Sequence, residues 1–528
     1  PAGGTRFPRR ALLISVDDYL YFNPVQYGPP GPSAHNVHTL ANQLNKGLHV
    51  PLDQVVELSD ATPDAGGKRG RAAARPPLKP VIEQTVTDFL NTSRAQDRLL
   101  LLFIGHAVEM DGAVYLVPVE GESGNKETLI PLQWLYDRLE QCKACQKILI
   151  LDVCRFDPSR GFERPGSGSA DAKVPGAMTA KMDEALAKPP PGVQVWSACT
   201  KDQFSLEYDD TGVFLDALWT AGSRGIPGVI QHPDEPIRVD KLVEAINQKM
   251  AAALRPYRKQ QVSRLAGTEP EEGAPYDPSE PEPPRVQPKL PIASGEAFPL
   301  GQLHELLAEI DVPPIKITKE EVRLRPEAMP FFTKKVMQKY AAADGDDTDF
   351  RKAVKDAVKV LNGAIKGKRL QDEWPAPANE QRFKDQVTNY QRKEVAGVQR
   401  ELTEAFDNLK KAGTPEARAQ EPKRWQANYD FVKARLEEEL AYLNEYQGLL
   451  GQIKKELPPI DPKLQTGWRV ASQSTLSDRD AKKFAKDADK TLDKIIKDYP
   501  DTPWAVLAKR DKLTALGMEW QAARLGSE

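Results

Sequence analysis

Two residues that could act together in covalent catalysis each follow a run of apolar residues. Cys154 follows the run 147–153, and His106 follows the run 99–105. Both runs have the composition of buried strands, and open α/β sheets place their active sites at the carboxyl ends of strands. If the two strands are neighbours, a thiol and an imidazole meet there as nucleophile and base. The sequence therefore predicts a cysteine peptidase.

Residues 10–300 alternate strand patterns with helix patterns, which predicts an α/β fold: a mostly parallel sheet flanked by helices. Strands are expected at 11–16, 55–58, 98–105, 114–119, 147–153 and 192–198, and helices at 35–47, 80–93, 131–141, 177–187, 212–222 and 239–254. We place this domain at residues 9–300. Within it, the segment 268–290 is so rich in Pro, Glu and Asp that we expect a flexible loop.

Strand patterns end near residue 300, and long charged helices follow. We expect a linker at 301–330 and then an all-α region, hairpin-like or bundle-like, at 331–528. Its helices are expected at 331–343, 349–366, 379–412, 416–456, 477–498 and 503–525. Thr414-Pro415 separates the two longest and favours an antiparallel hairpin. An apolar stripe along 436–453 fits the core of a helix pair or, alternatively, a partner-binding face.

The composition excludes several classes of function. The chain has 528 residues and a formal net charge of −3, so no global field attracts nucleic acid. No run approaches the roughly 18 apolar residues of a membrane span. Four cysteines do not make a disulfide framework, and the pair Cys142 and Cys145 lacks the further ligands of a zinc site. We expect that pair to be structural, with a redox or metal role as the alternative, and Cys199 to be a small core residue.

The first residue is Pro1 rather than Met. We therefore expect the natural start to be missing, and the sequence leaves the cellular location undetermined, with the cytoplasm favoured.

The order of several short motifs resembles that of the caspase-like cysteine peptidases, and in particular of the bacterial metacaspase and paracaspase groups. The motifs lie at 103–106 (Phe-Ile-Gly-His), 111–118, 150–155 (Ile-Leu-Asp-Val-Cys-Arg), 196–199, 205–207, 212–218 and 261–267. A histidine about 50 residues before the cysteine is a spacing of that family. The resemblance covers about residues 9–300 and implies a caspase-like fold.

The resemblance also implies a role for each residue of the site. Cys154 is the nucleophile and His106 its acid–base partner, and the backbone N–H groups of Cys154 and Ala107 form the oxyanion hole. Most family members have Gly where this chain has Ala107. If that position requires a positive φ, alanine there lowers catalytic efficiency. Arg155, next to the nucleophile, either lowers the pKa of the thiol or faces solvent.

Acidic residues near the nucleophile predict the substrate class. Asp152 lies two residues before Cys154, on the same side of its strand, where a carboxylate favours Arg or Lys at P1. Metacaspases and paracaspases carry an acid at this position and cut after basic residues; a capping or supporting role is the alternative. Their second acid aligns with Asn36, so another residue would have to replace it. The candidates are Glu207, Asp209, Asp17, Asp18, Asp202 and Asp210, and Asp209-Asp210 could equally be a solvated turn.

Residues 156–175 have the composition of a surface loop and contain Arg160, Arg164 and Lys173. In the family such loops are often cut during activation. We therefore expect either self-cleavage after one of these basic residues or an uncleaved surface loop.

Two functions remain open from the sequence. The first is a caspase-like endopeptidase with a basic P1 preference, which acts on a protein or peptide. Its C-terminal helices would recruit substrate, bind a partner or restrain the protease. The second is a weak or inactive caspase-fold scaffold that acts through those helices. No metal, cofactor, nucleic acid or membrane span is expected, and calcium activation, which some metacaspases need, is the one option that the resemblance adds.

Overall fold

The computed structural model describes most of the chain. The described residues are 7–25, 37–60, 76–158, 160–164, 176–208, 211–224, 238–268, 275–289, 296–310, 326–342, 347–367 and 370–525. The chain divides into two compact units, which are described one at a time. Unit 1 comprises Pro1–Pro158 and Gly166–Pro291, and unit 2 comprises Ser159–Pro165 and Ile292–Glu528.

Unit 1 is built on a six-stranded sheet whose strand order is β12-β9-β7-β3-β1-β2. Its strands are β1 (Arg9–Ser15), β2 (Val55–Ser59), β3 (Arg98–Ile104), β7 (Gln146–Asp152), β9 (Gln194–Ser197) and β12 (Arg264–Ala266). All neighbours run parallel except β12, which is antiparallel to β9. The expected α/β class with a mostly parallel sheet is therefore confirmed.

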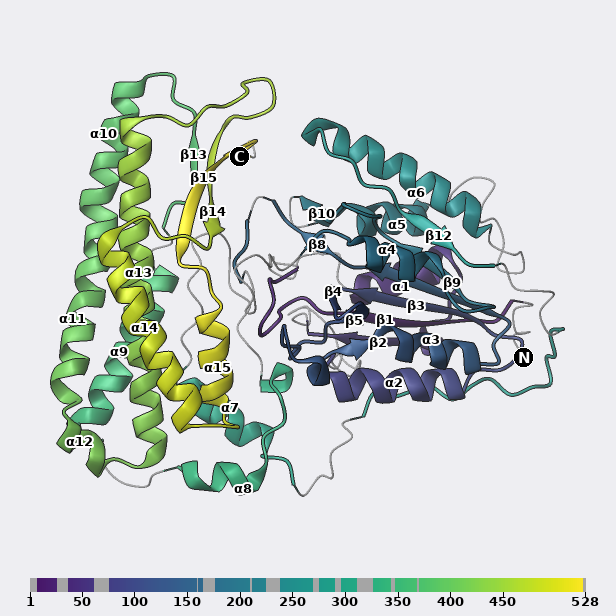
Figure 1. The fold of residues 1–528 in the computed structure, drawn as a ribbon, viewed down its shortest axis with the longest axis horizontal. Helices are drawn as coiled ribbons and strands as arrows, with labels where there is room; N and C mark the ends of the chain where they lie inside the picture. Colours follow the sequence, from purple (N-terminus) through teal and green to yellow (C-terminus); the bar gives the residue numbers. More distant parts are fainter. Residues whose placement is uncertain are drawn as a thin grey trace. The chain divides into compact units, whose positions relative to one another are not determined.

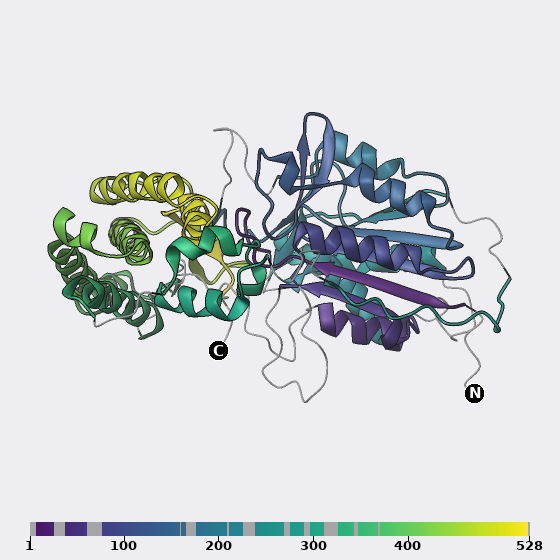
Figure 2. The ribbon, with the colours of Figure 1, turned by 90° about the horizontal axis from the view of Figure 1, so that it is seen from below.

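Helices cover both faces of this sheet (Figure 2). They are α1 (Val37–Gly47), α2 (Lys79–Asn91), α3 (Leu132–Gln141), α4 (Ala180–Ala187), α5 (Val213–Arg224) and α6 (Val239–Leu254). Apolar residues of α1, α5 and α6 form one core layer with side chains of β1, β3, β7 and β9. Helices α2, α3 and α4 lie on the other face, where the Tyr136 hydroxyl of α3 donates to the Ala185 carbonyl of α4. The sheet is thus buried on both sides, as its continuous apolar strands require.

Two small sheets follow the carboxyl ends of the central strands. One contains β4 (Ala107–Met110), β5 (Ala113–Leu116) and β6 (Ile130–Pro131), and the other contains β8 (Arg155–Phe156), β10 (Ser205–Tyr208) and β11 (Thr211–Gly212). The first begins directly after His106 and the second directly after Cys154. Each candidate residue is therefore held between a strand of the central sheet and a strand of a smaller one.

The Pro-rich segment of unit 1 is more ordered than the sequence predicts. Its described part, residues 275–289, is held by side chains that donate to its carbonyl oxygens. Gln54 Nε2 lies 3.2 Å from the Pro283 oxygen, Arg94 Nη1 3.1 Å from the Pro281 oxygen, and Gln96 Nε2 3.1 Å from the Asp277 oxygen. The expectation of a flexible loop over 268–290 is wrong for this part, because polar donors at the amino end of the sheet supply partners that composition alone does not show.

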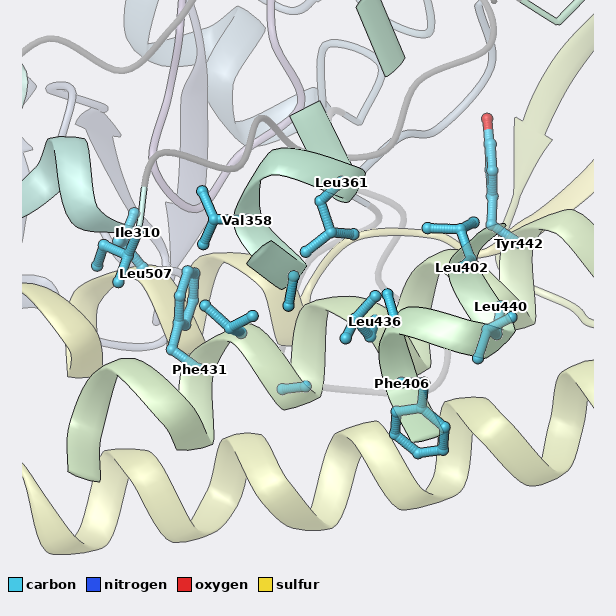
Figure 3. Close-up of a cluster of buried hydrophobic side chains, with 14 of the residues drawn as sticks. Ile310, Val358, Leu361, Leu402, Phe406, Phe431, Leu436, Leu440, Tyr442 and Leu507 are labelled. Carbon is cyan, nitrogen blue, oxygen red and sulfur yellow. The ribbon is translucent and has the colours of Figure 1, made fainter. Parts of the chain in front are cut away.

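Unit 2 is mostly helical (Figure 1). Its helices are α7 (Leu300–Glu309), α8 (Lys334–Met337), α9 (Asp349–Gly367), α10 (Glu380–Tyr390), α11 (Ala396–Ala412), α12 (Pro415–Gln420), α13 (Lys423–Lys455), α14 (Arg479–Asp498) and α15 (Pro503–Lys512). Helix α13 is buried on most of its sides, and its Phe431, Leu436 and Leu440 lie in one apolar cluster with residues of α9, α11 and α15 (Figure 3). Among the described residues, no helix is long and apolar enough to cross a membrane.

The antiparallel helix hairpin expected around Thr414-Pro415 is confirmed. Gln391, which precedes α11, bonds to the Gln447 carbonyl at 3.1 Å, and Gln399 of α11 bonds to Asn444 at 3.2 Å, so residues later in one helix meet residues earlier in the other. The stripe along 436–453 is buried within unit 2. It is helix core rather than an exposed partner-binding face.

The expectation of an all-α C-terminal region is wrong in two places. A three-stranded antiparallel sheet joins β13 (Glu373–Pro375), β14 (Gly467–Gln473) and β15 (Gly517–Ala523), and β15 lies where the sequence predicts the end of a helix. These strands pair across long separations in sequence, which local patterns do not report. Helix α7 also lies in the predicted linker 301–330 and belongs to unit 2.

Candidate active site

The pairing of β3 with β7 brings His106 and Cys154 together at the carboxyl ends of two neighbouring strands. Ile104 pairs with Asp152 in the parallel register, and the Gly105 N–H donates to the Asp152 carbonyl at 3.0 Å. His106 and Cys154 each lie two residues beyond that register pair, on strands that are about 4.8 Å apart. The expectation that the two strands are neighbours is confirmed. At these carboxyl ends the order of the strands along the chain also reverses, between β1 and β3, and such a reversal is the usual place for a site in an open α/β sheet.

The hydrogen bonds of His106 fix which ring nitrogen carries the proton. Nε2 lies 2.6 Å from the Asn23 carbonyl oxygen, which can only accept, so Nε2 is the protonated nitrogen. Nδ1 is buried and has no hydrogen-bond partner among the described residues. Burial is the main cause that lowers the pKa of His106, to about 4. The ring is therefore neutral near pH 7 with a lone pair on Nδ1, as a general base requires.

Tyr19 supports His106 from the segment that follows β1. The His106 backbone N–H donates to the Tyr19 hydroxyl at 2.7 Å, and the two ring centroids are 4.7 Å apart. Gly105 makes this approach possible, because a Cβ there would lie 2.1 Å from the Tyr19 hydroxyl oxygen. Sequence reasoning missed both Tyr19 and Asn23. The signal available was a run of aromatic residues directly after the first strand, between residues 19 and 22.

Cys154 has a strained backbone. Its φ is 62°, a left-handed conformation that costs a residue with a side chain about 1–2 kcal/mol. The pairing of β8 with β10 holds it there, since the Ser205 N–H donates to the Cys154 carbonyl at 3.0 Å. Its sulfur contacts the thiol of Cys199, and this contact, with burial, raises the pKa of Cys199 well above its usual range. Cys199 is fully buried, as a core residue is expected to be.

The backbone of Ala107 is free to donate. The Val117 N–H bonds to the His106 carbonyl at 3.0 Å, so Ala107 and Leu116 form a pair that exchanges no hydrogen bonds. The Ala107 N–H therefore points away from β5. Ala107 is not among the residues with positive φ, so its alanine carries no backbone penalty.

Two of the acids predicted for a basic P1 residue, Asp152 and Glu207, are buried, and both pair with Arg155. Arg155 Nη1 lies 3.0 Å from Asp152 Oδ2, and Nε and Nη2 bond to Glu207 Oε1. Burial raises the pKa of Asp152 and raises that of Glu207 to about 8, while Arg155 opposes both shifts. The expectation that Arg155 faces solvent is wrong, since its side chain is fully buried.

The other candidate acids are not gathered around Arg155 in the same way. Asp17 is buried and accepts from Ser15 Oγ at 3.0 Å, and Asp60 accepts the backbone N–H groups of Asp17 and Asp18 at 2.8 and 2.9 Å. Burial, with the charge of Asp17, raises the pKa of Asp60 to about 8. Asp202 lies in an exposed turn. Three further candidates lie outside the described residues: Asn36, Asp209 and Asp210.

The basic residues predicted for self-cleavage are not in an exposed loop. Arg160 and Arg164 belong to unit 2 and are 4% and 2% exposed. Arg160 Nε lies 2.8 Å from Glu163 Oε1, and its carbonyl accepts the Ser472 N–H of β14 at 2.9 Å. A surface loop is therefore the wrong description of residues 160–164, because backbone pairing with β14 buries them. Lys173 lies outside the described residues.

The site is closed in this structure. Cys154 and His106 are each 1% exposed. A cavity of about 250 Å³ opens at the other end of the strands, where it is lined by Pro8, Arg10 and residues 276–283. Cys142 and Cys145 bond through their thiols to the carbonyls of Leu90 and Asp97. Among the described residues, no group of three or more His, Cys, Asp or Glu could hold a metal ion.

Comparison with known proteins gives little beyond these observations. No protein-family model matches the chain, and no curated protein matches it. Among solved structures, the Drosophila initiator caspase Dronc superposes with a TM-score of 0.28 and 9% sequence identity, over 51% of this chain and 84% of the caspase chain. A superposition with this identity and TM-score does not assign the fold or the site, which follow from the strand order and the contacts described above.

Proposed function

We propose that the chain is a cysteine endopeptidase of the caspase-like type, similar to bacterial metacaspases and paracaspases, with Cys154 as nucleophile and His106 as base. One observation carries the proposal: the register of β3 with β7 sets the two residues at matching positions, and His106 presents an unprotonated Nδ1. The role of base needs a lone pair on a neutral ring, and burial supplies it.

The reaction follows from these groups. His106 Nδ1 takes the thiol proton as the Cys154 sulfur attacks the scissile carbonyl carbon, and the N–H groups of Ala107 and Cys154 stabilise the oxyanion. The imidazolium then gives its proton to the leaving amine, and a water molecule hydrolyses the acyl-enzyme. The Asn23 carbonyl stabilises the imidazolium, because it accepts a hydrogen bond from the Nε2–H group throughout the reaction.

The proposed P1 preference is Arg or Lys, since Asp152 and Glu207 are buried carboxylates that contact Arg155, the residue after Cys154. Unit 2 is proposed to recruit substrate, bind a partner or restrain the peptidase. Its apolar stripe along 436–453 is committed to its own core, so a partner would bind another of its surfaces.

The test is cleavage of fluorogenic peptides with Arg, Lys, Asp or Ala at P1 by the full chain under reducing conditions, with and without calcium. We expect cleavage after Arg and a loss of about 10³-fold or more in Cys154→Ala and His106→Ala. Cys142→Ala is the matched control, because its buried thiol bonds to the Leu90 carbonyl and should leave the rate unchanged. If wild type and Cys154→Ala are equally inactive in all conditions, the peptidase proposal fails.

A second candidate, a caspase-fold scaffold without peptidase activity, is favoured by the burial of Cys154 and His106. A chloromethyl ketone carrying Arg at P1 separates the two functions. Labelling of Cys154 in wild type but not in His106→Ala supports the peptidase. No labelling, even after long incubation, supports the scaffold.

A further inference from the structure

The guanidinium of Arg155 is enclosed by acidic residues. It bonds to Asp152 on one side, at 3.0 Å, and to Glu207 on the other, and its side chain is 0% exposed. Asp152 is held in place by Ser205, whose hydroxyl donates to Oδ1 at 2.5 Å. Gln261 in turn donates to the Ser205 oxygen at 3.3 Å. Both carboxylates therefore face the same planar cation, in the arrangement that recognises an arginine.

The space around this cation is fitted to it. Gly212 pairs with Glu207 across the β10–β11 hairpin, and a Cβ on Gly212 would lie 2.5 Å from Arg155 Nη2. Gly212 is not among the glycines with positive φ, so its backbone does not require glycine. The requirement is for room beside the guanidinium.

We propose that Arg155 is an internal substitute for the P1 side chain, which occupies the carboxylate pair that a basic substrate residue would use and so keeps the site closed. The inference rests on the proposed function and names its regulation. A second guanidinium cannot share two carboxylates without repulsion, so substrate entry requires Arg155 to leave. Arg155 follows the nucleophile directly, and its movement would therefore also shift the strained backbone of Cys154.

The binding test uses methylguanidinium as the probe and does not depend on peptidase activity. The substitution Arg155→Ala should leave a cavity lined by Asp152 and Glu207. Calorimetry on the full chain should show that this variant binds methylguanidinium about tenfold or more tighter than wild type does. Adding Glu207→Gln to Arg155→Ala should remove most of that gain. Arg264→Ala is the matched control, because Arg264 pairs with Asp183 in a half-exposed place at the β12 edge.

If Arg155→Ala does not fold, Arg155→Gln replaces it. Its neutral side chain is shorter than that of arginine but can still donate a hydrogen bond to a carboxylate, and the same criterion applies. A folded variant that binds methylguanidinium no better than wild type overturns the proposal and makes Arg155 a structural ion-pair partner. If Arg155→Ala binds methylguanidinium through Glu207 but neither wild type nor any variant cleaves peptides, the proposed pocket is supported and the peptidase function is refuted. Should wild type cleave Arg-P1 peptides, Arg155→Ala should cleave them about tenfold faster at low substrate concentration.

Discussion

Each unit of this molecule contains an arginine whose side chain is fully buried beside carboxylates, and the two clusters differ in what surrounds them. In unit 1, Arg155 pairs with Asp152 and Glu207 at the carboxyl edge of a sheet, next to Cys154. In unit 2, Arg435 of α13 pairs with Glu438 at 2.7 Å and lies 3.7 Å from Asp511 of α15. A buried charge cluster by itself therefore does not identify a site.

The difference lies in how the partners are supplied. Arg435 and Glu438 are one turn apart on the same helix, so their pairing comes with the helix and stabilises its packing. Arg155 and Asp152 are also three residues apart, but they belong to strands β8 and β7, and Glu207 reaches Arg155 from β10, 52 residues further along the chain. Carboxylates that converge at the carboxyl end of a sheet, beside a nucleophile, are typical of a binding site, whereas a charged cluster between packed helices is typical of a core.

The largest effect expected from this comparison is on stability. Arg435→Ala should lower the free energy of unfolding of unit 2 by about 3–5 kcal/mol, because it leaves Glu438 buried without its cation and leaves Asp511 with Arg510. Urea denaturation of the full chain measures it. Lys490→Ala is the control, since the Lys490–Asp487 pair is exposed and should change stability by about 0.5 kcal/mol or less. A loss in Arg435→Ala no larger than in this control would contradict the assignment of Arg435 to the core.

A smaller loss is expected where residues 160–164 pair with β14. Gly161 has a φ of 72°, and a Cβ there would lie 2.3 Å from the Ser472 carbonyl oxygen. Gly161→Ala should cost about 1–3 kcal/mol and expose the peptide bond after Arg160 to trypsin, measured by limited digestion and mass spectrometry. Gly112→Ala, with a φ of 76° and nothing within 4 Å, carries only the backbone penalty. Equal digestion of the two variants after Arg160 would show that β14 does not protect it.

Each cluster should make the stability of its unit depend on pH, through one glutamate. Glu207 and Glu438 both have a pKa raised by burial to about 8, so the folded chain binds their protons more tightly than the unfolded chain does. Stability should therefore fall as the pH rises from about 4 to about 8. Glu438→Gln should flatten this fall in the transition of unit 2, and Glu207→Gln in that of unit 1. An unchanged slope in either variant would refute the shift assigned to that residue.

The smallest effect is expected at Ala107. The direction of its backbone N–H group is set by the pairing of β4 with β5 and not by its methyl group. Ala107→Gly should cost about 0.5–1 kcal/mol, because glycine loses more entropy in a strand. The rate at which iodoacetamide alkylates Cys154 should not change. A faster rate would mean that the Ala107 methyl group itself helps to close the site.

Much of unit 1 could be predicted from sequence because its signals are local. The apolar runs that become β3 and β7 are continuous, as strands buried on both faces must be. These runs end directly before His106 and Cys154. Once the two strands are assumed to be neighbours, the sequence therefore predicts that the two residues lie at equivalent positions on them. The sheet β13–β14–β15 was not predictable, because its strands pair only with segments that are distant in sequence.

By itself the sequence determined which residues could carry the chemistry, since residue type and hydrophobic period are properties of short segments. Tertiary structure alone decided their state. In the folded chain, the Asn23 carbonyl and the Tyr19 hydroxyl bond to His106. Arg155 lies inside and pairs with Asp152 and Glu207, and the Arg160 carbonyl bonds to β14. The physical reason is that hydrogen bonds and ion pairs are formed between whichever groups folding brings together, and a buried polar group must find such a partner wherever it lies in the chain.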